Sequence, residues 1–180
     1  MRLPATLSLL LLVIALLLPL APPVAGQDPE PTLADAHRPE DGVLFGGQPD
    51  ESQLRALAAA GYRVIDLRMP EENRGYDEAE AAQTLGLEYH NLPVGGATLS
   101  DPETFERFFE LFETVERPVA VHCASGNRVG GLYYAWLVAR QGVPREEALE
   151  RARENGLTSE GLRETVDAYL DAHPPHDENP

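Results

Sequence analysis

The 180-residue sequence contains no lysine and a single cysteine, and its 30 acidic residues outnumber its 14 basic ones. Without lysine, the protein can form no Schiff base and has no amine nucleophile. One cysteine, Cys123, forms neither an internal disulfide nor a cysteine-rich zinc or iron–sulfur site. The net charge of −16 argues against nucleic acids and anionic lipid surfaces as partners, because both repel an acidic chain. The five histidines are scattered along the chain, so we expect no metal site and no cofactor.

The first 26 residues have the features of a secretory signal peptide. Arg2 supplies a positive charge, residues 9–18 form an unbroken apolar run, and residues 24–26 are small, as at a cleavage site. A membrane span requires about 20 apolar residues, and this run is shorter. We therefore expect cleavage, export to the periplasm or the cell exterior, and no stable membrane insertion. An uncleaved N-terminal anchor is the alternative.

The rest of the chain has the pattern of one α/β domain over residues 42–173. Residues 27–41 are rich in proline and acidic residues, which predicts a disordered leader, and residues 174–180 form a tail. Between them, helical patterns alternate with short apolar runs of strand length, at residues 43–45, 62–67, 87–92 and 118–122. Such alternation predicts a mostly parallel central sheet flanked by helices on both faces.

Capping residues indicate where several of the helices begin. Asp50 precedes a helix that ends at Gly61, and Ser100 with Glu103 has the spacing of a capping box. Phenylalanines recur at helical spacing in the helix after that box, which is typical of a surface facing the hydrophobic core. Further helices are predicted from Asp77, after Arg128, from Pro144 and from Thr158.

The segment VHCASGNRVGG, residues 121–131, contains the candidate chemistry. A buried strand ends at His122, Cys123 opens the next loop, Gly126 permits a tight turn, and Arg128 lies where a helix begins. Backbone amides in such a loop converge on one point and bind an anion, and arginine adds a bidentate donor. The predicted anion-binding residues are Ala124, Ser125, Gly126, Asn127 and Arg128. Because this field favours the thiolate, Cys123 is the candidate nucleophile.

A purely structural interpretation of the same residues stays open. A lone cysteine is commonly a small buried hydrophobe, and a Gly-Asn pair commonly marks a plain turn. We favour a functional site because cysteine, glycine and arginine coincide at one strand-to-helix junction. Arg68, at the end of another strand, either adds positive charge at the same sheet edge or pairs with Glu71 or Glu72 on the surface.

The heptapeptide HCASGNR resembles the active-site loop of protein tyrosine phosphatases, dual-specificity phosphatases and rhodaneses. The stretches GGQPDESQLRALAAAGYRVIDLR, LEYHNLPV and VAVHCASGNR are similar to the phosphatase-like domain of the beta-lactamase-hydrolase-like proteins. The resemblance implies a dual-specificity-phosphatase-like fold, with Cys123 as nucleophile and Arg128 as oxyanion binder. It also implies that His122 braces the loop through backbone hydrogen bonds.

Three departures from the phosphatase pattern bear on the reaction. Arginine follows cysteine after five positions, as in the rhodanese pattern, whereas phosphatases have six. Val129 stands where phosphatases usually carry serine or threonine. The region that usually holds the general acid reads PVGG, at residues 93–96, and contains no carboxylate. Asp101 is either a late substitute for that acid or a residue that serves the N-terminus of a helix.

Sulfur transfer needs no general acid, because sulfite and thiolates are good leaving groups. We therefore favour a sulfurtransferase that works through a persulfide on Cys123. The alternatives are a phosphatase with a phosphocysteine intermediate and an inactive anion-binding module. The substrate expected is a small anion or a persulfide, because a strongly acidic body slows encounter with large anions. The oligomeric state is not indicated by the sequence.

Overall fold

A computed structural model describes residues 30–73 and 75–174, so the predicted signal peptide lies outside the described residues, as do residues 175–180 of the tail. The helices and strands are, in chain order, β1 (Val43–Gly46), α1 (Glu51–Ala59), β2 (Arg63–Asp66), the 3-10 turn η1 (Pro70–Glu72), α2 (Glu78–Thr84), β3 (Tyr89–Asn91), the 3-10 turn η2 (Gly96–Ser100), α3 (Pro102–Thr114), β4 (Val119–His122), α4 (Asn127–Ala139), α5 (Arg145–Glu154) and α6 (Glu160–Ala172).

The four strands form one parallel sheet in the order β1-β4-β2-β3. β4 therefore lies between β1 and β2, and its register places His122 beside Gly46 on one side and Asp66 on the other. All four carboxyl ends meet at the same edge of the sheet, which is where ligands bind in open α/β sheets. The predicted α/β class with a parallel central sheet is confirmed.

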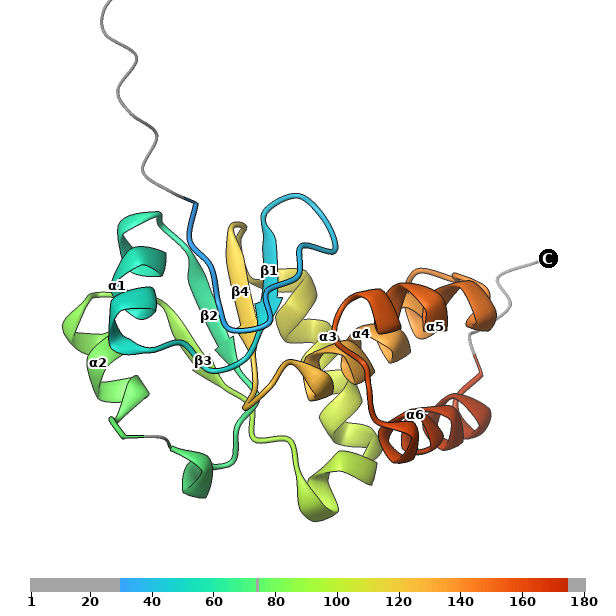
Figure 1. Ribbon diagram of the computed structural model, residues 1–180. Helices are drawn as coiled ribbons and strands as arrows, with labels where there is room; N and C mark the ends of the chain where they lie inside the picture. The colour runs from blue at the N-terminus through green and yellow to red at the C-terminus, as the bar shows by residue number, and fades with distance from the viewer. Residues whose placement is uncertain (1–29, 74, 175–180) are drawn as a thin grey trace, which may run out of the picture.

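The helices cover both faces of this sheet (Figure 1). α1 and α2 bury Leu54, Leu57 and Ala82 against Leu44, Val64 and Ala120, which point to one face of the sheet. α3 to α6 pack on the other face, over the larger core that contains Phe45, Ile65 and Val121. Neighbouring strand residues thus alternate between the two cores, as the period of two in a strand requires. The phenylalanine stripe of α3 lies in the larger core, as predicted: Phe105, Phe108, Phe109 and Phe112 are fully buried.

Residues 30–41 are not the disordered leader that their composition predicts. Leu33 is buried, and the main chain of His37 pairs in antiparallel fashion with Phe45 on the outer edge of β1. The amide of Gly47 donates a hydrogen bond of 2.7 Å to the carbonyl of Ala34. Composition misled the prediction because main-chain hydrogen bonds to an open sheet edge do not depend on the side chains of the segment that makes them.

The predicted start of α3 is wrong by one residue. Its N-cap is Asp101, whose carboxylate accepts a hydrogen bond from the amide of Glu103, and Ser100 belongs to η2. The predicted cap of α1 is confirmed, because Asp50 accepts from the amides of Ser52 and Gln53. Within the ranges that the structure describes, no helix is both long enough and apolar enough to cross a bilayer.

Candidate active site

Cys123 follows directly on the central strand β4 and is only 1% exposed. Its amide donates to the carbonyl of Gly46, at 3.3 Å, and Ser125 pairs with Gly47, so the loop is backed by the end of β1. Gly126 has φ +82°, and a Cβ there would lie 3.5 Å from the carbonyl carbon of Gly46. Glycine is therefore the residue that this turn favours, because L side chains strain the left-handed backbone.

The loop leads straight into the N-terminus of α4. The first amides of a helix have no partner within the helix and carry partial positive charge. Among the hydrogen bonds between described backbone groups outside helices and strands, none is donated by the amides of residues 124–128. The bridge between Gly47 and Ser125 already involves the main chain of this segment. Anion binding by these amides next to Cys123 stays a prediction from the sequence.

Asn127 anchors this end of α4 to a distant part of the chain. Its Oδ1 accepts hydrogen bonds from the amides of Thr158 and Ser159, at 2.8 and 3.0 Å. These two residues precede α6, so the loop that follows Cys123 is fixed from both β1 and the α5–α6 connection. The sequence places Asn127 in the anion-binding loop, but its side chain acts as a clamp between two segments.

The guanidinium of Arg128 is held by three segments. Its two terminal nitrogens form a fork with the carboxylate of Glu72, at 2.7 and 2.8 Å, and Nη1 also donates to the carbonyls of Val94, at 2.7 Å, and Leu67, at 3.3 Å. Burial by itself would lower the pKa of Arg128, but the hydrogen bond to Glu72 and the neighbouring Cys123 raise it. Arg128 therefore lies close to the sulfur of Cys123 and stays protonated.

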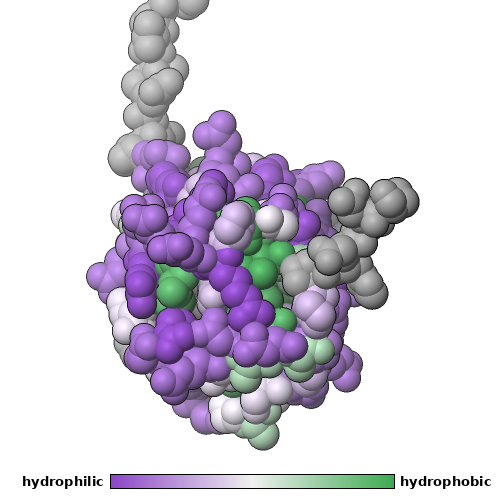
Figure 2. Space-filling model, turned by 90° about the vertical axis from the view of Figure 1, so that its right-hand side faces the viewer, coloured by the Kyte–Doolittle hydropathy of each residue, from purple (hydrophilic) through white to green (hydrophobic). Residues whose placement is uncertain are grey.

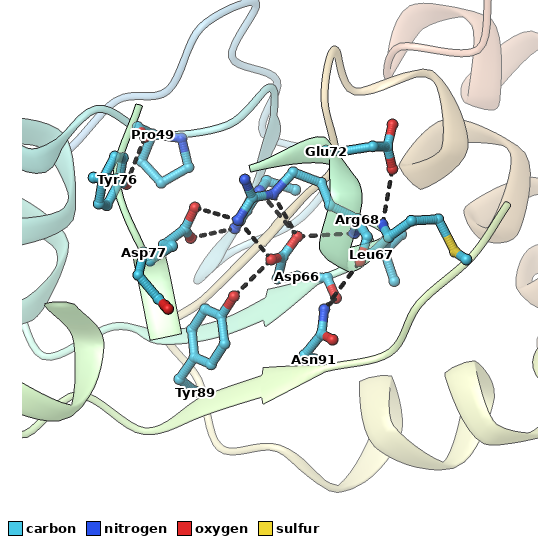
Figure 3. A network of polar contacts seen from close by, with 12 residues as sticks. Pro49, Asp66, Leu67, Arg68, Glu72, Tyr76, Asp77, Tyr89 and Asn91 are labelled. Carbon is cyan, nitrogen blue, oxygen red and sulfur yellow. Dashed lines mark hydrogen bonds and ion pairs between the residues drawn. The ribbon is translucent and has the colours of Figure 1, made fainter. Parts of the chain in front are cut away.

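Glu72 is the acidic partner that the site provides for Arg128. Its Oε2 also accepts from the amide of Met69, at 2.8 Å (Figure 3). The hydrogen bond from Arg128 lowers the pKa of Glu72, and partial burial opposes this effect only in part. The sequence suggested Glu72 as a surface partner of Arg68, and this alternative is wrong.

Arg68 does not face the loop of Cys123 and is completely buried elsewhere. Its Nε and Nη2 donate to the two oxygens of Asp66, at 3.0 and 2.8 Å, and Nη2 also donates to Glu78, at 2.7 Å. Tyr89 donates to Asp66 at 2.6 Å, and Figure 3 shows Asp66, Arg68 and Tyr89 converging between β2 and β3. Both predicted roles for Arg68 are therefore corrected. The sequence could not indicate the partners of Arg68, because one of them, Glu78, is buried although the pattern of its helix is otherwise that of an exposed surface.

His122 belongs to the same buried cluster. Its Nε2 lies 2.7 Å from Oε1 of Glu78 and its Nδ1 lies 3.6 Å from Oδ1 of Asp66. These are ion-pair distances, although neither ring nitrogen meets the angles of a hydrogen bond to any described group. The resemblance implied that His122 braces the catalytic loop through backbone groups, whereas its ring contacts two carboxylates.

Asp101 caps α3 with its side chain and is exposed. Gly95, in the loop where phosphatases carry their acid, has no side chain, and a Cβ there would meet Met69 at 3.0 Å and Nη1 of Arg128 at 3.7 Å. Gln48 belongs to the GQP stretch that resembles the beta-lactamase-hydrolase-like proteins, and the sequence favours a tight turn for it. Both polar atoms of its side chain are buried without a hydrogen-bond partner among the described residues.

One group of side chains within the described ranges has ligand atoms close enough together for a metal ion. Asp66, Glu78 and His122 each offer one such atom, all within 4.8 Å of one another. The guanidinium of Arg68 already binds both carboxylates. The positive charge at this position is therefore supplied by Arg68, which competes with a metal ion for the two carboxylates.

A buried cysteine at the end of a central parallel strand, a left-handed glycine turn and an arginine at the next helix define the cysteine-dependent phosphatase-like class of α/β proteins. A family model described as a DSP-PTPase phosphatase fused to NAD+ kinase matches residues 28–167. The chain belongs to this family. The resemblance to beta-lactamase-hydrolase-like proteins is also confirmed, since the beta-lactamase hydrolase-like protein of Xylella fastidiosa is 37% identical over 96 residues.

That match covers 51% of this chain and 22% of the Xylella protein, so the chain spans less than a quarter of its relative's length. Among solved structures, Tk-PTP in its active form has a TM-score of 0.64 at 23% identity, over 76% of this chain and 96% of Tk-PTP. Kinase associated phosphatase also has a TM-score of 0.64, at 14% identity, over 74% and 88% of the two chains. At these identities the likeness establishes the fold.

Proposed function

We propose that the protein is an exported sulfurtransferase that works through a persulfide on Cys123. The thiolate of Cys123 attacks the outer sulfur of a donor such as thiosulfate, and a new S–S bond forms. The bond between the two sulfur atoms of the donor breaks, and sulfite leaves with the electron pair. A thiolate, cyanide or sulfite acceptor then attacks the outer sulfur of the persulfide and restores the Cys123 thiolate.

The observation that supports this proposal most strongly is the short loop from Cys123 to Arg128. Gly126 turns in the left-handed region, and α4 begins at the very next residue. Only four residues therefore separate the sulfur from the guanidinium. A loop of this length offers fewer amides than the phosphatase loop has for the three equatorial oxygens of a phosphoryl group, and it suits the smaller sulfane sulfur.

The acidic side chain at the site supports the same reaction. Glu72 is the carboxylate that Arg128 contacts within the described ranges, and its lowered pKa keeps it ionised. An ionised carboxylate bound to arginine does not protonate a leaving alkoxide, a step that contributes about 10²- to 10⁴-fold in enzymes that use it. Sulfite and thiolates leave without that proton.

A phosphatase is the second candidate, and the family match favours it. The matching family model is described as a phosphatase, and the names of Tk-PTP and kinase associated phosphatase belong to the same class. In that reaction Cys123 would attack phosphorus and form phosphocysteine, with Arg128 bound to the equatorial oxygens. The proton for the leaving group would come from a group other than Glu72.

Intact-mass spectrometry distinguishes the two reactions. After treatment with thiosulfate and desalting, we expect a gain of about 32 Da, the mass of one sulfur atom in a persulfide. The gain should disappear in Cys123→Ser and on addition of a thiol. Faster turnover of para-nitrophenyl phosphate than of any sulfur donor would establish the phosphatase instead. Sulfate binding without either activity would establish an inactive anion-binding module.

Export is part of the proposal and depends on the sequence of residues 1–26. Expression of the full chain followed by cell fractionation tests it. Processed protein, with its N-terminus near residue 27, is expected outside the cytoplasm. Unprocessed protein in the membrane fraction would indicate an anchor.

A further inference from the structure

A buried charged cluster includes His122, the residue that precedes the candidate nucleophile. It consists of Asp66, Arg68, Glu78 and His122, which come from the end of β2, from α2 and from the end of β4. Each of these residues is at most 2% exposed. Burial of a charge reduces stability unless the charge is paired. Removal of one partner leaves the other charge buried and uncompensated. We therefore infer that the cluster fixes the position or the electrostatic environment of the residues next to it.

His122 lies at ion-pair distance from both acids of the cluster. Asp66 and Glu78 carry two negative charges, and Arg68 carries one positive charge. The two ring nitrogens of His122 face the two carboxylates, Nε2 toward Glu78 at 2.7 Å and Nδ1 toward Asp66 at 3.6 Å. Each ring nitrogen therefore lies near one carboxylate, although neither meets the criteria for a hydrogen bond.

Leu67, which lies between Asp66 and Arg68, links the cluster to Arg128 and to the main chain next to Cys123. The amide of Leu67 donates to the carbonyl of His122, at 2.8 Å. The carbonyl of Leu67 accepts from Nη1 of Arg128, at 3.3 Å. The ends of β2 and β4 are therefore connected at the site. A change in the cluster should alter both the position of Cys123 and the electrostatic potential at its sulfur.

We propose that Glu78 is a positioning residue, which holds the His122 ring in place and through it favours the thiolate of Cys123. Glu78 holds this position because its second oxygen is fixed by Arg68, at 2.7 Å. Two tyrosines also face the cluster. Tyr89 donates to Asp66. Tyr76 lies near Glu78, and burial and the charge of Glu78 raise its pKa, whereas Arg68 lowers it. We expect the position of the His122 ring to influence the ionisation of Cys123 because the two residues are adjacent in the chain. The proposal rests on the proposed function only in taking Cys123 as the nucleophile.

The single cysteine allows a direct test that requires no substrate. The ultraviolet absorbance of the thiolate is followed against pH, and the curve of the matching Cys123→Ser variant is subtracted. Glu78→Gln should move the midpoint of thiolate formation to higher pH, by about one unit. Glu80→Gln is the matched control, because Glu80 lies on the same helix and is exposed, and it should leave the midpoint unchanged.

A double-mutant cycle shows whether Glu78 acts through the histidine. In a His122→Asn background, Glu78→Gln should cause no further shift, because the ring that it serves is absent. An unshifted midpoint in Glu78→Gln, or additive shifts in the double variant, would overturn the proposal. Sulfur transfer is measured separately, so its absence would remove the proposed function and leave this result intact.

Circular dichroism and the melting temperature show whether each variant folds. Should Glu78→Gln not fold, Glu78→Asp carries the test, because it keeps the charge and withdraws the carboxylate from His122 by one methylene. We then expect a smaller shift in the same direction, which disappears in the His122→Asn background. A folded Glu78→Asp variant with the wild-type midpoint would overturn the proposal.

Discussion

Arg128 and Glu72 face each other through two parallel hydrogen bonds of 2.7 and 2.8 Å, although 56 positions separate them in the chain. A fork of this kind fixes the plane of the guanidinium as well as its place. Both terminal nitrogens are engaged, whereas none of the hydrogen bonds of the described residues is donated by Arg128 Nε. The proposed function therefore assigns the Nε edge to the substrate anion. Glu72 therefore determines which edge of the Arg128 guanidinium remains available to a ligand.

The first prediction concerns Glu72→Gln. The amide retains the shape of the carboxylate but loses its charge and one acceptor oxygen, so Arg128 should become mobile and sulfur transfer should fall about tenfold. Steady-state kinetics with thiosulfate and cyanide would measure the loss. Glu71→Gln is the control, because Glu71 is the exposed neighbour in the same 3-10 turn. Equal rates in both variants would contradict the assigned role of Glu72.

The second prediction concerns acid stability. The pKa of Glu72 is lower in the folded protein than its ordinary value of 4.5, through its hydrogen bond to Arg128. The unfolded chain therefore takes up its proton first as pH falls, and the stability due to Glu72 is present above pH 4.5 and lost below it. Urea unfolding of wild type and Glu72→Gln at several pH values should show the largest difference above pH 4.5, with convergence in acid.

The third prediction concerns Arg128→Lys. A lysine keeps the charge but has no planar fork, so it cannot bind Glu72 and the carbonyls of Leu67 and Val94 in one geometry. We expect kcat/KM to fall by about 10²-fold, comparable to the loss of an oxyanion-binding donor. Rates close to wild type would show that only the charge of Arg128 matters.

The fourth prediction compares glycines with left-handed backbones. Gly126→Ala and Gly142→Ala place a side chain at φ +82° and φ +64°, and each should reduce the free energy of unfolding by about 1–2 kcal/mol. A Cβ at Gly142 meets nothing within 4 Å, whereas one at Gly126 meets the backbone of Gly46. Gly46 accepts from the amide of Cys123, so only Gly126→Ala should also reduce sulfur transfer. Urea titrations with parallel assays would separate the two effects.

The fifth prediction concerns Asn127→Ala. It removes the hydrogen bonds from the exposed amide of Thr158 and the part-buried amide of Ser159, which should cost about 1 kcal/mol of stability. The control is Asn155→Ala, which removes a single exposed hydrogen bond to the carbonyl of Arg151 and should cost less. Thermal unfolding of the two variants would rank them, and the reverse order would show that the clamp to α6 is unimportant.

The elements of the fold could be predicted from the sequence where the pattern is local. Apolar runs of strand length mark all four strands, and Asp50 and Asp77 cap their helices as expected. The candidate loop from Cys123 to Arg128 follows from the coincidence of residue types at a strand end. The partners of the charged residues could not be predicted in this way. Glu72, Glu78 and Glu80 look alike in an acidic sequence, and only burial distinguishes them.

By itself the sequence determined the alternation of strands and helices, the position of the lone sulfur and the five-residue interval to Arg128, because these depend on residues that are close together along the chain. The tertiary structure decided which acid holds Arg128, that Arg68 and His122 share a buried cluster with Glu78, and that residues 30–41 cover the edge of β1. Those outcomes depend on the order in which the strands pair. Pairing brings residues from distant segments within a few ångströms, and desolvation then permits only the charged arrangements that neutralise one another.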